Sequence, residues 1–232
     1  VTYYYRGESR RRANDWEGAI DDFTKALLIA PSSTLYLSRA SALEGKNDFR
    51  GAIDDYTAAI ALETRAGVLG SLHHSRGRIY WELKEFDSAI ADYTKSIQHS
   101  PGSSTTYYNR GVARMYKKNP RGAIEDYNRA LEIDPDYIVA LYFRGRCRLA
   151  LGDPDGAIGD LTRAIEIDPK FTEYFYNEAL ARLPLGDARA AKGDYLGAIA
   201  EWKRAIELSP SLKKELLPRI ERAERRLKEK GL

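Results

Sequence analysis

Five arginines recur along the chain in one local setting, each followed directly by glycine or alanine. They are Arg6, Arg39, Arg76, Arg110 and Arg144. A guanidinium group binds a carboxylate or a phosphate through two parallel hydrogen bonds, so a ladder of arginines could hold an anionic ligand. An acid recurs with the same regularity, at Asp22, Asp55, Asp92, Asp126, Asp160 and Glu201. Because the acids recur together with the arginines, we favour internal pairs, within one repeat or between neighbours, over a ligand-binding ladder.

The other reactive side chains give little support for catalysis. His73 and His74 are adjacent, and neighbouring helix residues diverge by about 100°, so the two rings do not converge on a metal. Cys147 lies between Arg146 and Arg148 with no histidine or second cysteine near it in the sequence, so we expect an inert, partly buried thiol. No phosphate-binding loop, dinucleotide fingerprint or nucleophile elbow is present. We therefore expect no enzyme activity, no cofactor and no metal site.

The elements that position these residues are repeated. The phrase that begins Gly122-Ala123-Ile124 occurs in six variants, and its alanines are separated by 33, 37, 34, 34 and 41 residues. These alanines are Ala19, Ala52, Ala89, Ala123, Ala157 and Ala198. A unit of this length cannot bury its apolar face alone and must stack on its neighbours.

Each unit has the pattern of helix, turn, helix. Between Ser104 and Pro135, apolar residues recur at intervals of three and four on both sides of Asn119-Pro120. The small residues are expected where the two helices cross, since a larger side chain there would overpack by about 1–3 kcal/mol. Large side chains are expected to fill the space between units, namely Phe23, Tyr56, Tyr93, Tyr127 and Trp202.

This pattern of small residues, an aromatic and a terminal proline resembles the tetratricopeptide repeat family, from about Tyr3 to Pro210. The resemblance implies an all-α, right-handed α-solenoid whose first helices line a concave face. We expect one continuous array with units at about 1–32, 33–69, 70–103, 104–137, 138–171 and 172–210. Departures occur at His73 and Leu141, where the family usually has tryptophan or tyrosine.

Two stretches depart from the regular spacing. Residues 63–70 add three residues without a proline, which favours a longer second helix followed by a flexible turn. In the last unit, Gly186-Asp187 and Gly193-Asp194 are candidate turns seven residues apart, so the first helix could run on to Lys192. We expect Pro184 to kink or interrupt that helix.

Residues 211–232 read as an amphipathic capping helix. Leu216, Ile220 and Ala223 lie on one face, and lysines and arginines occupy the others. Acidic residues interleave with this basic run, so we favour a solvated cap. Binding of an acidic partner or of nucleic acid by this helix is the alternative.

The resemblance implies that first-helix positions face a ligand groove. The candidate groove residues are Tyr4, Tyr5, Arg12, His74, Arg78, Trp81, Tyr108, Asn109, Tyr142, Arg146, Tyr176 and Asn177. Aromatic, arginine and asparagine side chains are typical of protein-interaction surfaces, although some of these rings must fill space between helices. We favour Tyr108, Asn109, Tyr142, Arg146 and Asn177 as contact residues.

These observations predict an interaction scaffold that binds a peptide or helix of a partner protein. The family members that clamp the C-terminal carboxylate of heat-shock chaperones carry a lysine at the fifth first-helix position. Here no unit has it, which argues against chaperone tails as ligands. Nucleic-acid binding and a self-assembling or engineered array are the alternatives.

The amino-acid composition narrows the possible class of protein further. The 232 residues are 43% hydrophobic and 31% charged, which is a globular composition. The net charge of +3 gives no global attraction to nucleic acid, and no apolar run suggests a membrane span. The single cysteine cannot form an internal disulfide, so no compartment is indicated. The chain begins at Val1 inside repeat pattern, and we expect it to be a fragment.

Overall fold

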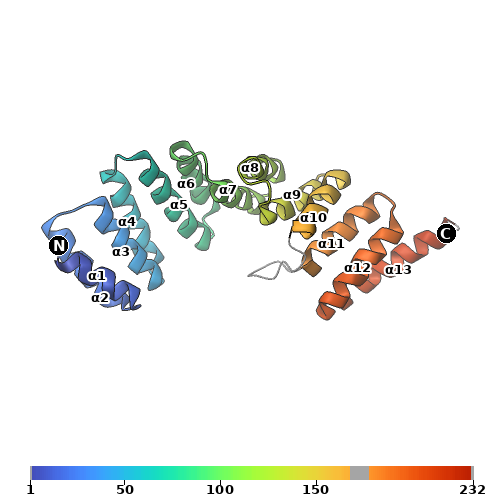
Figure 1. Ribbon diagram of the computed structural model, residues 1–232, viewed down its shortest axis with the longest axis horizontal. Helices are drawn as coiled ribbons and strands as arrows, with labels where there is room; N and C mark the ends of the chain where they lie inside the picture. Colours follow the sequence, from blue (N-terminus) through green and yellow to red (C-terminus); the bar gives the residue numbers. More distant parts are fainter. Residues whose placement is uncertain (1, 168–177, 231–232) are drawn as a thin grey trace. The chain divides into compact units, whose positions relative to one another are not determined.

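The computed structural model describes residues 2–167 and 178–230, and these form helices joined by short turns, with no strand among them (Figure 1). The chain divides into two compact units, Val1–Lys117 and Lys118–Leu232. The first unit contains α1 (Thr2–Arg12), α2 (Trp16–Ile29), α3 (Ser33–Gly45), α4 (Phe49–Leu62), α5 (Ala66–Glu82), α6 (Phe86–His99) and α7 (Ser104–Tyr116). The second contains α8 (Pro120–Ile133), α9 (Ile138–Ala150), α10 (Pro154–Ile167), α11 (Glu178–Ala191), α12 (Tyr195–Leu208), the short 3-10 helix η1 (Pro210–Leu212) and α13 (Lys213–Glu229).

Helices pack in pairs within each unit. In the first unit α1 pairs with α2, α3 with α4 and α5 with α6, and each second helix also contacts the first helix of the next pair. In the second unit α9 pairs with α10 and α11 with α12, while α13 packs on α12. The predicted pairing of helices is confirmed. That the pairs form one continuous array over residues 1–210 stays a prediction.

The second helices begin at a capping side chain that explains the repeated glycine. Asp15 accepts a hydrogen bond from the backbone N–H of Gly18 at 3.0 Å, which satisfies a donor of the first turn. A Cβ at Gly18 would lie 2.2 Å from the Asp15 carboxylate. In the third pair, Glu85 makes no such cap, and Ser88 replaces the glycine. The glycine is therefore needed only where the cap folds over it.

Small residues let the paired helices approach closely. All the repeated alanines of the six units are fully buried. A Cβ on Gly7 would come within 2.7 Å of the Phe23 ring, and one on Gly145 within 2.9 Å of Leu161. We expected the large side chains between units, and Phe23 shares a core cluster with Ala42 of the next pair. The Phe23 ring also packs tightly against Gly7 of its own pair.

The insertion at residues 63–70 lengthens a different helix from the one predicted. The second helix α4 ends at Leu62 with the usual 14 residues, whereas the following first helix, α5, has 17. Glu63 is buried and accepts hydrogen bonds from the backbone N–H groups of Thr64 and Arg65, both at 3.0 Å. The prediction of a longer second helix was wrong, since the added residues lengthen α5 instead. The Glu63 carboxylate holds the turn between the two helices.

Pro184 does not interrupt its helix. α11 runs from Glu178 to Ala191 with Pro184 inside it, and the predicted turn at Gly186-Asp187 is absent there. Gly186 instead lies against the Trp202 indole, where a Cβ would be 2.4 Å from Nε1. The second predicted turn is confirmed, with Gly193 at φ +82° and Asp194 capping α12.

The C-terminal helix is amphipathic as predicted. Leu216, Ile220 and Ala223 are buried in a cluster with Ile199 and Trp202 of α12. The opposite side of α13 is exposed and charged. The helix therefore covers the last pair.

Candidate functional site

The repeated arginines pair with aspartates of their own helix pair. Each guanidinium donates from Nε and Nη2 to the two carboxylate oxygens of the aspartate 16 residues later, at 2.5–2.9 Å. The pairs are Arg6–Asp22, Arg39–Asp55, Arg76–Asp92 and Arg144–Asp160, and all four aspartates are buried. The prediction of internal pairs is confirmed at these positions. For Arg110 and Asp126, which lie in different compact units, it stays a prediction.

The same arginines also contact the preceding second helix. Nη1 of Arg39 donates to Thr24 Oγ1 at 2.9 Å, and Nη1 of Arg76 donates to Thr57 Oγ1 at 2.7 Å. Arg110 repeats the contact with Thr94 at 3.1 Å, and Arg144 with Asn128 at 2.8 Å. The guanidinium groups of Arg39, Arg76 and Arg144 thus each join their own pair to the preceding second helix, and their donors are used inside the protein.

Two of the buried aspartates, Asp22 and Asp92, have a pKa below the ordinary value. The hydrogen bond from Arg6 lowers the pKa of Asp22 from its ordinary value, against the opposing effect of burial. At Asp92 burial acts to raise the pKa, but hydrogen bonds from Arg76 and His73 outweigh it and the pKa is lowered. His73 Nδ1 lies 3.0 Å from Asp92 Oδ1, so this histidine belongs to the core.

Two predicted groove residues of the first unit bridge neighbouring first helices. Nδ1 of His74 on α5 lies 2.9 Å from Thr106 Oγ1 on α7. Arg78, also on α5, forms an ion pair with Glu44 on α3, and that carboxylate also accepts a hydrogen bond from Tyr56. The first helices α3, α5 and α7 are therefore linked by polar contacts on one side.

Aromatic residues form two clusters in the first unit, one around Trp81 of α5 and one around Tyr4 of α1. The Trp81 ring meets Tyr116 edge-on at 4.8 Å and Phe86 at 5.1 Å between centroids. Tyr4 and Tyr5 form another edge-on pair at 5.3 Å. Tyr5 and Tyr116 are 65% and 62% exposed, so each cluster presents one accessible ring.

A cleft of about 280 Å³ opens beside His74, and seven of its nine lining residues are serine or threonine. Its lining residues are Gly70, Ser71, His74, Ser75, Ser96, Ser100, Ser103, Thr105 and Thr106. No lysine, arginine or acidic residue lines it. Burial, with a smaller effect of Arg78, lowers the pKa of His74, so the imidazole is neutral at neutral pH. We call this the hydroxyl cleft.

The two favoured contact residues of the first unit lie one turn beyond the hydroxyl cleft. Asn109 follows Thr105 by four residues on α7 and therefore shares its face. Tyr108 and Asn109 are half-buried, and Arg12 at the end of α1 is exposed. The structure thus brings His74 and Asn109 to one region and places Arg12 on another helix, α1.

In the second unit, Tyr142 is only 5% exposed, packed edge-on against Phe143 at 5.3 Å between centroids. Arg146 is exposed and its guanidinium lies 5.5 Å from the Tyr142 ring centroid. Tyr142 therefore supports Arg146 as a packing residue. Tyr176 and Asn177 lie outside the described residues, and the groove assignment as a whole stays a prediction.

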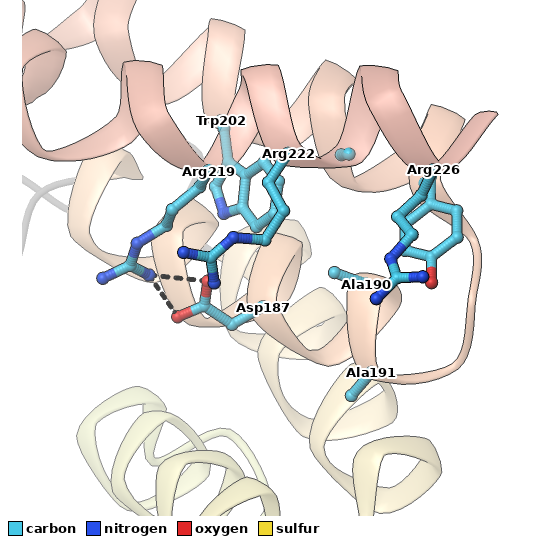
Figure 2. A pocket seen from close by; sticks show the side chains of 9 residues that line it. Asp187, Ala190, Ala191, Trp202, Arg219, Arg222 and Arg226 are labelled. Atoms are coloured by element: carbon cyan, nitrogen blue, oxygen red, sulfur yellow. Dashed lines mark hydrogen bonds and ion pairs between the residues drawn. The ribbon is translucent and has the colours of Figure 1, made fainter. Parts of the chain in front are cut away.

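A second cleft, of about 450 Å³, lies between α11, α12 and α13. It is lined by Asp187, Ala190, Ala191, Tyr195, Trp202, Arg219, Arg222, Ala223 and Arg226. Figure 2 shows the three arginines extending from α13 toward the helix that carries the aspartate. We call this the basic cleft.

The arginines of the basic cleft differ in what they bind. Arg219 Nη1 donates to both carboxylate oxygens of Asp187 at 2.6 Å, and its Nη2 donates to Glu215 at 2.8 Å. Arg226 has an exposed pair with Glu229 at 3.2 Å. Among the residues that the structure describes, Arg222 has no hydrogen bond or ion pair. Arg222 is therefore available to bind a ligand in this cleft.

Family models described as tetratricopeptide repeat match residues 2–33, 70–102, 104–137 and 138–171. Together these matches cover more than half of the chain. The chain belongs to the tetratricopeptide repeat family. The predicted family is confirmed, and so is the fold class, an all-α solenoid of tetratricopeptide repeats.

Solved structures of other tetratricopeptide repeat proteins are similar. A crystal structure of MamA is 25% identical, with a TM-score of 0.68 over 78% of this chain and 94% of that chain. The C-terminal part of a repeat protein from Cytophaga hutchinsonii is 22% identical, with a TM-score of 0.77 over 91% and 84%. YrrB, described as a TPR protein with an unusual peptide-binding site, is 22% identical, with a TM-score of 0.70 over 81% and 92%. No curated protein matched the chain.

The sequence reasoning missed both clefts in this tetratricopeptide repeat chain. The signal for the basic cleft was present, since Arg219, Arg222 and Arg226 follow one another at helical spacing on one face. The hydroxyl cleft combines residues of α5, α6 and α7, and only packing brings these together. Within residues 2–167 and 178–230, no group of three metal-ligating side chains converges, and no helix has the length and apolarity that a membrane span requires.

Proposed function

We propose that this tetratricopeptide repeat chain is a non-catalytic interaction scaffold that binds an extended peptide of a partner protein. The peptide would lie along the first helices of residues 2–117, across the hydroxyl cleft. The observation that carries this proposal is the uncharged lining of that cleft, with hydroxyl groups and a neutral imidazole. Such groups can each donate and accept hydrogen bonds, which suits the backbone amides of a peptide.

The internal arginine pairs support the same function. Because the repeated guanidinium groups are used by buried aspartates, they do not form an anion-binding ladder. Phosphate contacts supply most of the affinity for nucleic acid, and the hydroxyl cleft offers no cation for them. The chemistry of this cleft therefore favours a peptide over a nucleic acid.

Asn109 and the exposed rings add specificity to this proposed site. Asn109 lies one turn beyond the hydroxyl cleft on the same face of α7. Its amide would bind a peptide N–H or C=O group. Exposed aromatic rings such as Tyr116 are suited to anchor apolar side chains of a partner. The groove would thus combine backbone contacts with a few anchors.

A peptide library displayed on phage would test the proposal. Peptides selected on the intact chain are synthesised, and their dissociation constants are measured by calorimetry. We expect Thr105→Arg, which places a bulky cation in the cleft, and Asn109→Ala each to weaken binding by about tenfold, the effect of losing roughly 1.4 kcal/mol. The matched control is Gln98→Arg on the exposed side of α6.

The control should leave the dissociation constants unchanged within about twofold, since Gln98 lines neither cleft. Peptides that bind equally to the wild type and to Thr105→Arg would overturn the proposed site. Circular dichroism melting of each variant establishes that it remains folded.

A further inference from the structure

The basic cleft differs in chemistry from the proposed peptide groove. It lies in residues 118–230 and combines apolar walls with cations. The walls come from Ala190 and Ala191 on α11, Ala223 on α13, and the aromatic rings of Tyr195 and Trp202 on α12. A ligand for this cleft must therefore offer both an apolar group and negative charge.

The arginines lie along one edge of α13. Arg219, Arg222 and Arg226 are three and four residues apart, so they share one face, beside the buried stripe of Leu216 and Ile220. Lys230 follows Arg226 by four residues and continues the row of cations. Its Nζ lies 5.1 Å from the centroid of the Tyr195 ring. The acidic residues Glu221 and Glu224 lie on other faces of the helix and are exposed.

Internal pairing removes only part of this positive charge. Arg219 is neutralised by Asp187 and Glu215, and its geometry fixes α13 against α11 (Figure 2). Both side chains of the Arg226–Glu229 pair are exposed. Because exposed ion pairs contribute little to stability, Arg226 can exchange Glu229 for a ligand carboxylate. Among the described residues Arg222 has no partner and Lys230 has no ion pair, and the Lys230 ammonium lies over the Tyr195 ring.

The apolar part of the cleft is held rigidly. Trp202 is 3% exposed, and its indole N–H donates to the Leu183 carbonyl at 3.3 Å. Gly186 allows the indole to lie directly on α11, because a Cβ there would meet it at 2.4 Å. Since Trp202 is fixed from two sides, the cleft is preformed, which reduces the entropy lost on binding.

We propose that the basic cleft binds an acidic peptide segment of a partner protein, one with an apolar side chain between carboxylates. The apolar side chain would enter between α11 and α13, and the carboxylates would pair with Arg222, Arg226 and Lys230. This inference rests on the proposed scaffold function and adds a second site of different chemistry to it. An arginine and a carboxylate can form two parallel hydrogen bonds, which favours this ligand.

The test uses the intact chain and a fluorescent peptide with a central phenylalanine flanked by glutamates. Fluorescence polarisation is measured at low and at physiological salt. We expect binding that weakens as salt rises, and a peptide with glutamine in place of every glutamate should not bind. Arg222→Ala should weaken binding by about tenfold, because it removes a guanidinium group that would form charged hydrogen bonds with a peptide carboxylate.

Arg225→Ala is the matched control. Arg225 is exposed on the same helix and also lacks a partner among the described residues, but it does not line the cleft. This variant removes the same charge, so it should change binding by less than about twofold. Neither arginine is buried, so both variants should keep the melting temperature of the wild type.

Three outcomes would overturn the inference. The first is absence of binding by the acidic peptide, and the second is an equal loss in both variants, which would indicate a diffuse electrostatic effect. The third is tighter binding of a single-stranded DNA oligonucleotide through Arg222, which would assign the cleft to nucleic acid. If the library peptides still depend on Thr105 and Asn109, the proposed scaffold function survives each of these results.

Discussion

Ser33 donates a hydrogen bond from its hydroxyl to Glu63 Oε2 at 2.8 Å, which joins the first turn of α3 to the residue that ends α4. The same carboxylate accepts from the backbone and the side chain of Arg65. One buried acid thus anchors the turn at which the repeat spacing is irregular. The next residue, Thr64, occupies the position at which the other units have a proline.

This anchor predicts a pH dependence of stability. Hydrogen bonds from the side chain and backbone of Arg65 hold the pKa of the Glu63 carboxyl well below its usual range. A lowered pKa in the folded state contributes stability above the unfolded value of 4.5, and this contribution is lost as pH falls below it. We expect Glu63→Gln to lower the melting temperature at pH 7 and to lose less stability on acidification than the wild type. The measurement is thermal unfolding between pH 7 and pH 3. The control is Glu221→Gln, because Glu221 is exposed on α13.

The arginine pairs predict a large loss of stability on truncation. Arg39→Ala would leave the carboxylate of Asp55 buried without its partner, which costs about 3–5 kcal/mol. Arg50 forms an exposed pair with Glu85, so Arg50→Ala should cost less than about 1 kcal/mol. Urea denaturation of both variants checks this difference. Equal, small losses would show that the internal pairs are not structural.

Two glycines in neighbouring helices predict effects of opposite sign. Gly145 lies against Leu161, so Gly145→Ala should overpack the helix crossing by about 1–3 kcal/mol. Gly159 is exposed inside α10 with no atom near a Cβ, so Gly159→Ala should stabilise the protein by about 0.5–1 kcal/mol. Chemical denaturation measures both changes. Destabilisation by Gly159→Ala would contradict the described packing of α10.

Cys147 is expected to be unreactive in the folded protein. It is fully buried, and burial raises the pKa of its thiol to about 11 despite the opposing effect of Arg146. The thiolate is the reactive form, so a disulfide reagent at pH 8 should label the native chain far more slowly than the chain in denaturant. Rapid labelling under native conditions would contradict the described burial of this thiol.

The pairing of the repeated arginines shows how far the sequence could predict the candidate site. Regular spacing predicted that Arg39 pairs with one of the repeated acids, because both recur once in each repeat, but it left open whether that acid belongs to the same repeat or to a neighbour. The spacing could not show that Arg39 also reaches Thr24 of the preceding pair, since that contact depends on how pairs stack. The prediction of groove residues was limited in a similar way. Helical register selected Tyr142, but register does not distinguish a ring on the surface from a ring that its neighbours cover.

The sequence by itself determined the family, the pairing of helices, and the pairing of the repeated arginines with internal acids. These properties are local or repeat with the unit, so periodicity reveals them. The tertiary structure alone decided that Pro184 stays inside α11, that Glu63 holds an irregular turn, and that Arg222 lines a cleft without an internal partner. Each of these depends on side chains from different helices meeting at one place, and such meetings occur once rather than in every repeat.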